Sequence, residues 1–360
     1  MKYVLTTVAL AAAASVAATA AFAQSGSVAS AVGGYTFEDA AMEAEGTKNF
    51  HSDDGVLTFA IVTHTAGNGF FDPVYAGALA AANLIGAKVL LLGSESPVDD
   101  PARAIEITNQ ILQDPNLDGL IMTTPQVGAY DDIVKTAMDN GIPVATTNSF
   151  DGGILNRSGI SHTGQDASAA AIAGEALVQC LIDKGVEGGS IVLPNSTAMG
   201  NIEVNNRVTS AYNAIVAGLQ AAGKLEAFTV DAGPENVGVD ADPNDPVNAI
   251  VSLFESRGNV VGAFAGNNVF TPALAQAVAQ TGMTGTICAY GFDLGPAQQE
   301  ALKAGNLTGA LGQQPFLQGF WPVMQLYLQI DRGIAAANLD TRAQLVTSEN
   351  VGDVGSRFEN

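Results

Sequence analysis

The stretch LTFAIVTHTAGNGFFDPVYAGALAAANLIGAKVLLL, residues 57–92, decides the fold. It starts with an apolar run, Leu57–Thr63, crosses a glycine-containing loop, enters an amphipathic segment at Asp72–Leu84 and ends in a second apolar run, Lys88–Leu92. This order is typical of a β-α-β unit. Because a crossover helix joins parallel strands, the stretch predicts the first unit of a parallel sheet.

The same rhythm repeats along the chain. Further strands are expected at Gly119–Met122, Pro143–Thr147, just before Gln165, and at Ser190–Leu193, Ala227–Val230, Val260–Ala265, Thr286–Tyr290 and Gly309–Leu311. Helices are expected near Pro101–Gln113, Asp131–Asn140, Asp166–Lys184, Ile202–Ala222, Pro246–Ser256, Thr271–Thr281 and Pro296–Ala304. Unbroken apolar strands need helices on both faces, so we predict an α/β fold with two doubly wound, Rossmann-like lobes.

The N-terminus predicts export. Residues 1–23 contain one Lys, an Ala/Val/Leu run and the small-x-small end Ala21-Phe22-Ala23, as in a signal peptide. Residues 24–54 have no sustained period and are expected to form an N-terminal extension. No later segment offers the apolar length of a membrane span. Roughly 335 residues remain, which is enough for two domains.

The amino-acid composition narrows the classes of molecule that the protein is expected to bind. The chain has 14 Lys and Arg against 36 Asp and Glu, a formal net charge of -22, which disfavours nucleic acid and anionic membranes as partners. Its two cysteines, Cys180 and Cys288, are too few for a disulfide framework. Because one falls on an expected helix and the other inside an expected strand, we expect two buried free thiols rather than a bridge, although export permits one.

Sequence motifs for catalysis are missing from the chain. Gly67-Asn68-Gly69 follows the first strand, but Asp72 stands where a dinucleotide fingerprint needs its third glycine. There is no phosphate loop, nucleophile elbow or His-Glu-x-x-His motif. His64 and His162 both end strands and would suit a metal pair only with a carboxylate, so hydrogen bonding or capping is the expected role. We therefore expect no cofactor, no metal and no enzyme.

The ends of the expected strands share one chemical type. Ligands of doubly wound sheets bind beyond the carboxyl ends of the strands. Amides, carboxylates and aromatic rings are found there: Asn68, Phe70, Phe71, Asn148, Gln165, Asn267, Asp293, Gln313 and Gln314. Such groups satisfy hydroxyls that both donate and accept, while rings cover C–H surfaces. The alternative, helix capping and core filling, holds equally for any single residue, but the joint placement favours a binding site.

With these residues, the chain resembles a known family, the ribose-type (cluster B, type I) periplasmic sugar-binding proteins of ABC transporters. The resemblance spans Val56 to about Val351. It rests on motifs in order: FAIV at 59–62, NGFF at 68–71, NGIPV at 140–144, AFAGNN at 263–268, YGFD at 290–293 and GQQP at 312–315.

Site residues follow from this resemblance. It implies that Asn68 binds the sugar, that Phe70 and Phe71 line the pocket with at least one ring stacked on the ligand, and that Asp293 accepts from hydroxyls beside Phe292. Further polar contacts would come from Gln165, Arg207, Asn267 and Gln313. Where ribose binders carry Asp-Arg, this chain has Asn148-Ser149. Neutral hydrogen bonding by Asn148 therefore replaces a charged clamp, which makes ribose itself doubtful.

The resemblance also implies a hinge of three chain crossings, near Gln165–Asp166, Gln313–Gln314 and Thr341–Arg342. Lobe I would then comprise residues 55–165 plus 314–341, and lobe II residues 166–313 plus 342–353. Closing the lobes buries the ligand and creates the shape that a permease distinguishes from the empty one.

We therefore expect a monomeric periplasmic protein that captures a monosaccharide or polyol and delivers it to an ABC importer. One alternative is a receptor subunit that presents its ligand to a chemoreceptor or membrane sensor. Another is a periplasmic metal-assisted hydrolase using His64 and His162. A sugar-responsive transcription factor is disfavoured, because the export signal lies where a DNA-binding headpiece would be.

Overall fold

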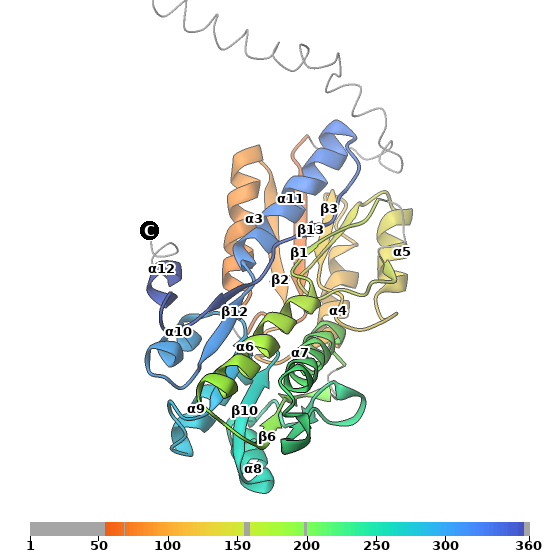
Figure 1. Cartoon of the computed structure of the whole chain (residues 1–360). Helices are drawn as coiled ribbons and strands as arrows, with labels where there is room; N and C mark the ends of the chain where they lie inside the picture. Colours follow the sequence, from red (N-terminus) through yellow and green to blue (C-terminus); the bar gives the residue numbers. More distant parts are fainter. Residues whose placement is uncertain (1–54, 68, 155–158, 198–199, 356–360) are drawn as a thin grey trace, which may run out of the picture.

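The computed structural model of the 360-residue chain describes residues 55–67, 69–154, 159–197 and 200–355. The predicted signal peptide and N-terminal extension lie outside these residues. Two parallel sheets with helices on their faces form the two halves of the molecule, stacked one above the other in Figure 1. The expected α/β fold with doubly wound sheets is confirmed.

Sheet A, in the first half, has the strand order β13-β5-β4-β3-β1-β2, and all its pairs are parallel. Its strands are β1 (Thr58–Thr63), β2 (Lys88–Gly93), β3 (Gly119–Met122), β4 (Val144–Thr147), β5 (Ser161–Gly164) and β13 (Leu339–Asp340). The helices around it are α3 (Asp72–Ile85), α4 (Pro101–Ile111), α5 (Asp131–Asp139) and α11 (Pro315–Arg332).

Strand β1 shows why this sheet is covered on both sides. Every residue from Thr58 to Thr63 is buried, and alternate side chains enter different cores. Phe59 and Ile61 pack with α3 and α11, whereas Ala60 and Val62 pack with α4 and α5. The unbroken apolar run is therefore explained by a strand that has a layer of helices on each face.

Helix α11 was not among the expected elements, although it packs tightly against α3 (Figure 1). The two helices approach at glycines: a Cβ at Gly319 would lie 1.7 Å from the carbonyl oxygen of Val74, and one at Gly77 would lie 2.0 Å from that of Phe316. Pro322 lies inside the helix, which is unfavourable for helix prediction from sequence.

Sheet B, in the second half, has the order β14-β12-β11-β10-β6-β8, with β14 antiparallel to β12. Its strands are β6 (Gly189–Val192), β8 (Phe228–Asp231), β10 (Val260–Ala265), β11 (Cys288–Phe292), β12 (Gly309–Gly312) and β14 (Gln344–Val346). One face carries α6 (Ala170–Asp183) and α7 (Ile202–Ala221), and the other carries α8 (Pro246–Arg257), α9 (Phe270–Gln280) and α10 (Pro296–Lys303). The small elements β7 (Pro194–Asn195), β9 (Val239–Asp240) and α12 (Val351–Gly355) complete this half.

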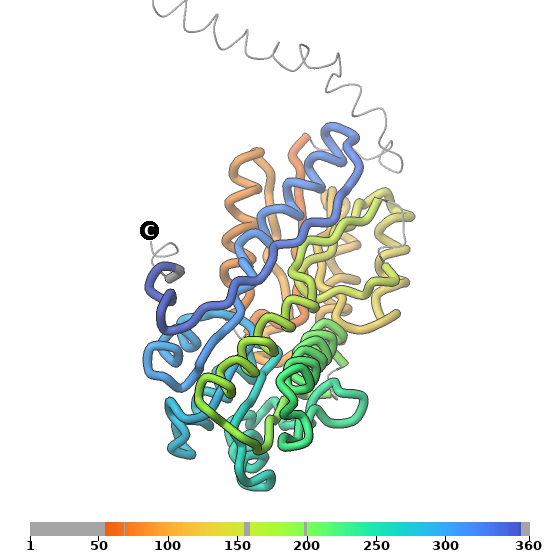
Figure 2. Tube along the Cα trace, viewed as in Figure 1, coloured from red at the N-terminus to blue at the C-terminus, as the bar shows by residue number. Residues whose placement is uncertain are grey.

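The chain passes between the sheets after β5, after β12 and after β13, as Figure 2 shows in the yellow-green and blue segments. Hydrogen bonds connect these passages: Thr341 N donates to Gly164 O at 2.8 Å, and Gln314 Nε2 donates to Thr341 O at 3.0 Å. Gln314 and Arg342, on two of the passages, have positive φ angles of 54° and 58°.

Cys180 and Cys288 form a disulfide, so the expectation of two free thiols was wrong. The secondary-structure positions were right: one cysteine lies on α6 and the other starts β11. Because α6 packs directly on β11, the two Cα atoms are 6.0 Å apart, within bonding range. Local pattern could not reveal this proximity, since the cysteines are separated by 108 residues.

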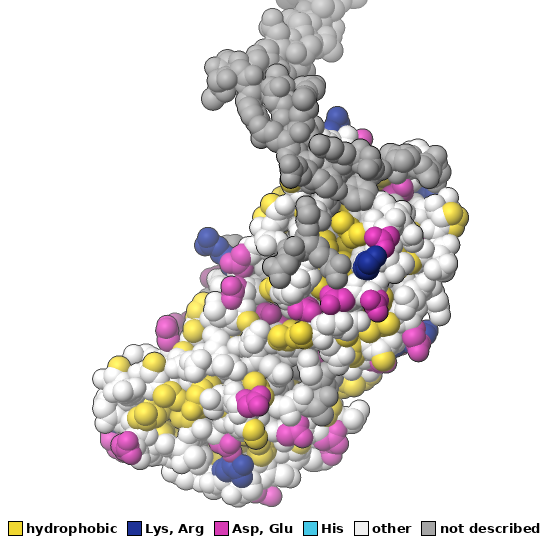
Figure 3. Space-filling model, turned by 90° about the vertical axis from the view of Figure 1, so that its right-hand side faces the viewer, with side chains coloured by type: hydrophobic (Ala, Val, Ile, Leu, Met, Phe, Trp, Pro, Cys, Tyr) yellow, Lys and Arg dark blue, Asp and Glu magenta, His cyan; other side chains and the backbone are white. Residues whose placement is uncertain are grey.

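In the part of the chain that the structure describes, no helix has the length and apolar character needed to cross a membrane. Figure 3 shows one face of the molecule, on which acidic side chains are scattered over both halves among polar and small apolar patches. This distribution agrees with the strong excess of Asp and Glu over Lys and Arg.

Candidate functional site

A cavity lies where the carboxyl ends of the two sheets face each other. It is lined by His64, Thr65, Phe70, Phe71, Asp99, Asn148, Ser149, Asn201, Val204, Arg207, Asn267, Asn268, Val269, Asp293 and Gln313. The structure therefore brings together most of the residues expected from sequence: Phe70, Phe71, Asn148, Arg207, Asn267, Asp293 and Gln313. They come from both halves of the molecule, as a cleft between two lobes requires.

The other expected site residues lie elsewhere. Asn68 is outside the described residues. Gln165 is buried beside the first passage between the sheets and does not line the cavity. Phe292 lies beneath Arg207, whose guanidinium carbon is 4.1 Å from the ring centroid. It supports a cavity residue instead of lining the cavity itself.

The aromatic residues after β1 form a wall. Phe71 is fully buried and makes edge contacts with Phe70 and His64, with ring centroids 5.1 and 5.5 Å away. Phe70 is partly exposed. Stacking of one of these rings on a ligand stays a prediction.

Asn148 and Asp293 occupy equivalent places in the two halves. Asn148 directly follows β4 and Asp293 directly follows β11, and both strands take the third place in their sheets. Both residues have positive φ angles, 60° and 75°. Asn and Asp tolerate this region better than other non-glycine residues, and such backbone outliers cluster at functional sites.

Arg207, on α7, is the cation of the cavity. It is buried, and its NH2 donates to Gln313 Oε1 at 3.3 Å while its NH1 lies 3.5 Å from Gly266 O. Gln313 in turn donates from Nε2 to Asp293 Oδ1. In the first half, Asn148 Nδ2 donates to Gln318 Oε1 at 3.1 Å, and Gln318 Nε2 donates to Gln313 Oε1 at 2.9 Å, which joins Asn148 to these contacts. This network holds polar groups of both halves in fixed orientations.

Two buried carboxyl groups near Arg207 have raised pKa values. Burial raises the pKa of Asp293, although the Arg207 charge and hydrogen bonds from Gln313 and from the Asn268 backbone oppose the rise. Burial also raises the pKa of Glu203 to about 7, against the attraction of Arg207. Glu203 Oε1 lies 3.8 Å from Arg207 Nε, and within the described ranges neither atom has a hydrogen-bond partner.

A second carboxylate group in the cavity was missed from the sequence. Asp99 lies beyond β2, just before α4, and lines the cavity with His64 and Asn201. His64 Nε2 is 3.4 Å from Asp99 Oδ1, and Asn201 Nδ2 donates to Asp99 Oδ2 at 2.7 Å. Burial alone would raise the pKa of Asp99, but His64, Asn201 and Arg207 together hold it below its ordinary value. Because Asp99 does not directly follow a strand, the pattern of polar residues at strand ends does not predict it.

His64 and His162 do not meet as a pair with a shared carboxylate. His64 Nδ1 pairs with Thr123 Oγ1 at 2.8 Å, whereas His162 Nδ1 pairs with Thr146 Oγ1 at 3.0 Å and its ring packs against Phe150 with centroids 3.8 Å apart. Burial lowers the pKa of His162 to about 3. Across the described ranges, no group of three or more potential metal ligands comes together.

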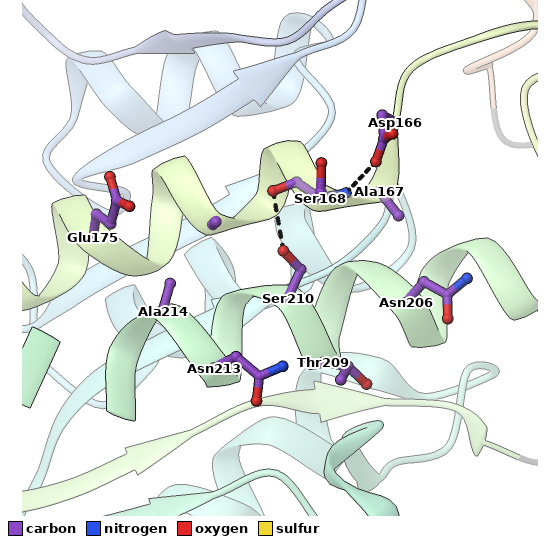
Figure 4. Close-up of a pocket in the computed structure, with 10 residues that line it drawn as sticks. Asp166, Ala167, Ser168, Glu175, Asn206, Thr209, Ser210, Asn213 and Ala214 are labelled. Carbon is purple, nitrogen blue, oxygen red and sulfur yellow. Dashed lines mark hydrogen bonds between the residues drawn. The ribbon is translucent and has the colours of Figure 1, made fainter. Parts of the chain in front are cut away.

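A second depression lies between α6 and α7 (Figure 4). Its polar rim includes Asp166, Ser168, Glu175, Asn206 and Asn213, all of them exposed. Ser210 Oγ donates to Ser168 O at 3.0 Å across the groove. Because all its residues come from one half and its polar groups face water, this groove lacks the buried, two-sided polar lining of the cavity between the sheets.

Solved structures share this fold. The chain matches a carbohydrate transporter solute-binding protein from Agrobacterium radiobacter in complex with D-arabinose, with a TM-score of 0.70 and 21% identity, covering 84% of this chain and 98% of that one. An ABC transporter solute-binding protein from Agrobacterium vitis, bound with α-D-tagatopyranose, gives a TM-score of 0.71 at 21% identity, with 84% and 98% covered.

The sequence also matches the xylose/arabinose-binding protein XylF from Sulfolobus acidocaldarius, at 26% identity over 311 residues, covering 83% of this chain and 73% of that protein. The family model described as a periplasmic binding protein domain matches residues 59–334, which is most of the chain and includes strands of both sheets. This is a family of transport proteins that bind solutes without converting them, which confirms that the chain is no enzyme. The chain belongs to the periplasmic binding protein family.

Proposed function

We propose that this protein captures a monosaccharide or polyol in the cavity between its two halves and delivers it to an ABC importer. The observation that carries the proposal is the lining of that cavity. Buried amides, a carboxylate and a guanidinium from both halves converge there, namely Asn148, Arg207, Asp293 and Gln313, together with the partly exposed amide of Asn267. These are groups that donate to and accept from hydroxyls.

The relatives support the same chemistry. The two solved structures named above hold an arabinose and a tagatose, and the curated relative is named for xylose and arabinose. Their ligands are neutral sugars with several hydroxyls. In this chain the charged pair of ribose binders is replaced by Asn148-Ser149. A pentose or a related sugar other than ribose is therefore the first ligand to test.

Residues 55–165 plus 314–341 serve in this proposal as lobe I, and 166–313 plus 342–353 as lobe II. The division is supported by the sheet membership of β5, β12, β13 and β14. Residues 1–23 direct the chain to the periplasm and are removed. The mature protein acts as a monomer, its closed form recognised by a membrane permease and, in a sensory setting, by a chemoreceptor.

The test begins with mature protein unfolded and refolded to remove bound ligand. A panel of pentoses, hexoses, ketohexoses and polyols is then screened by thermal shift, because a ligand that binds the folded state raises the melting temperature with its concentration. A sugar hit is followed by titration calorimetry on the wild type, Asp293→Ala and Glu175→Ala. Glu175 lies on the exposed groove of Figure 4 and is the matched control.

We expect a sugar to raise the melting temperature, Asp293→Ala to remove most of that binding and Glu175→Ala to leave it unchanged. If no sugar or polyol shifts the protein while amino acids or metal ions do, the sugar assignment is wrong. If both variants bind the sugar like the wild type, the binding site lies elsewhere.

A further inference from the structure

Asp99 lines the cavity although it does not directly follow a strand. It comes from the loop between β2 and α4 in the first half, and its side chain is only 8% exposed. It lines the same cavity as Asp293, which comes from the second half. The cavity therefore has one carboxylate from each side.

The Asp99 carboxylate is fixed in place. His64 approaches one oxygen and Asn201 donates to the other. Asn201 itself is held, because its Oδ1 accepts from the backbone N of Glu203 and Val204 at the start of α7, at 3.1 and 3.3 Å. Asn201 belongs to the second half, so Asp99 receives this bond only when the two halves are together.

These contacts do not use all the hydrogen-bond acceptor positions of the Asp99 carboxylate. Its two oxygens offer about four acceptor positions. The contacts with His64 and Asn201 use one on each oxygen, leaving acceptor capacity for a ligand. A group that only stabilised the loop would not need a place on the cavity wall.

The charges on the wall are unequal. Among the described lining residues the two carboxylates, Asp99 and Asp293, stand against one guanidinium, Arg207. Arg207 already contacts Gln313, Phe292 and the Glu203 side chain. An anionic ligand would bring a further negative charge between two carboxylates, whereas a hydroxyl would donate to either of them.

We propose that Asp99 is a second ligand-binding carboxylate, which accepts hydroxyl hydrogen bonds opposite Asp293 and makes the site select neutral polyhydroxylated ligands over sugar acids. This inference rests on the proposed function and deepens it. Asp99 supplies specificity by repulsion as well as by attraction, since the same charge that accepts from a hydroxyl excludes a ligand carboxylate.

The experiment compares neutral and anionic rings of the same stereochemistry. Titration calorimetry measures the best neutral sugar of the panel together with D-xylose, D-glucose and D-glucuronate, and with D-galactose and D-galacturonate. Wild type, Asp99→Asn and the exposed control Glu175→Gln are compared at one pH and one salt concentration. The ligand-free melting temperature of each protein reports its folding.

We expect the wild type to prefer the neutral sugar to its acid by at least about 10-fold, because like charges placed together in a cleft repel each other. Asp99→Asn should weaken the neutral sugar by about 10-fold or more and bring the neutral-to-acid ratio closer to one. Glu175→Gln should change neither quantity, although it removes the same charge.

Two results would overturn the proposal. One is a wild type that binds a sugar acid as tightly as its neutral counterpart, which needs no variant. The other is Asp99→Asn with an unchanged neutral-to-acid ratio, whether or not affinity and melting temperature fall, because Asp99 would then be only structural. A wild type that binds no sugar at all is different, since that outcome removes the proposed function first.

Discussion

The two halves share a strand order, but they differ in how they treat equivalent positions. After the third strand from the edge, the first half places the neutral Asn148 and the second half places Asp293, both with positive φ. After the next strand, β5 or β12, both halves place a glutamine. Gln313 bonds to Arg207 and Asp293, whereas both side-chain polar atoms of buried Gln165 have no hydrogen-bond partner in the described part of the chain.

This difference indicates a division of labour. The second half links Arg207, Gln313 and Asp293 by hydrogen bonds and is tied internally by a disulfide. The first half contributes the Asn148 amide, an aromatic wall and the Asp99 carboxylate, which accepts a hydrogen bond from Asn201 of the second half. We infer that the second half is the preorganised side of the cleft, and that the first half contributes the groups that complete the site on closure.

The largest expected effect concerns the disulfide, which has no counterpart in the described part of the first half. The double variant Cys180→Ala, Cys288→Ala should lower the free energy of unfolding by about 4 kcal/mol, because the bridge closes a loop of roughly 100 residues. Sugar affinity should change by less than about threefold, since neither cysteine lines the cavity. Denaturant unfolding with and without ligand measures both.

Reduction of the wild type in denaturant provides the control for side-chain packing, because it opens the bridge without changing the sequence. If the double variant and the reduced protein unfold at the denaturant concentration of the oxidised wild type, the second half is not stabilised by its bridge.

The next effect separates the equivalent residues of the two halves. Asp293→Ala should weaken sugar binding by about 10- to 150-fold, and Asn148→Ala by about 2- to 10-fold, because hydrogen bonds to a charged group are stronger than neutral ones. Both substitutions place Ala at a positive φ, so the backbone cost is matched. Titration calorimetry of the two variants against one sugar gives the ratio. Equal losses would contradict the assignment of the second half as the stronger binding side.

Much of this arrangement could be predicted from local sequence. The β-α-β rhythm placed the strands, and residues next to strand ends, such as Asn148, Asp293 and Gln313, do line the cavity. Their contacts with a ligand stay predictions. Parallel strands bring their carboxyl ends to one edge, so this step needs only topology.

What could not be predicted depends on proximity between distant segments. The Cys180–Cys288 bridge follows from α6 lying on β11. Asp99 reaches the cavity from a loop, and its bond to Asn201 joins residues 102 positions apart. Asn201 is the N-cap of α7, a role that is ordinary for Asn before a helix. Its Nδ2 also donates to Asp99 across the cleft. No local pattern encodes such second roles.

A third prediction concerns the pH dependence of stability, which has opposite signs for one buried titratable group in each half. Glu203, in the second half, has a pKa raised by burial from 4.5 to about 7, so its contribution to stability is present below about pH 4.5 and lost as the pH rises through 7. His162, in the first half, has a pKa lowered by burial from 6.5 to about 3, so its contribution is present above pH 6.5 and lost as the pH falls toward 3.

Chemical unfolding at about pH 5 and about pH 8 tests both signs. Relative to the wild type, Glu203→Gln should gain on the order of 2 kcal/mol of stability as the pH rises over this range. His162→Gln should gain a similar amount as the pH falls. Exposed Glu175→Gln should run parallel to the wild type at both pH values. Parallel profiles for all three variants would contradict the burial of these two groups.

The smallest expected effect concerns the two glutamines that follow β5 and β12, Gln165 and Gln313. Gln165→Leu should change the free energy of unfolding by less than about 1 kcal/mol, because it removes polar atoms that have no hydrogen-bond partner among the described residues. Gln313→Leu, the matched change, should cost about 2 to 3 kcal/mol, since it removes a buried hydrogen bond from each of the charged groups Arg207 and Asp293. Denaturant unfolding without ligand measures the free energy of unfolding of both variants.

Sugar titration then tests the role of Gln165. A roughly three- to tenfold weaker sugar affinity of Gln165→Leu with unchanged stability assigns the Gln165 amide to the ligand, as the family resemblance implies. A stability loss as large as that of Gln313→Leu would instead make Gln165 a structural group of the passage between the sheets.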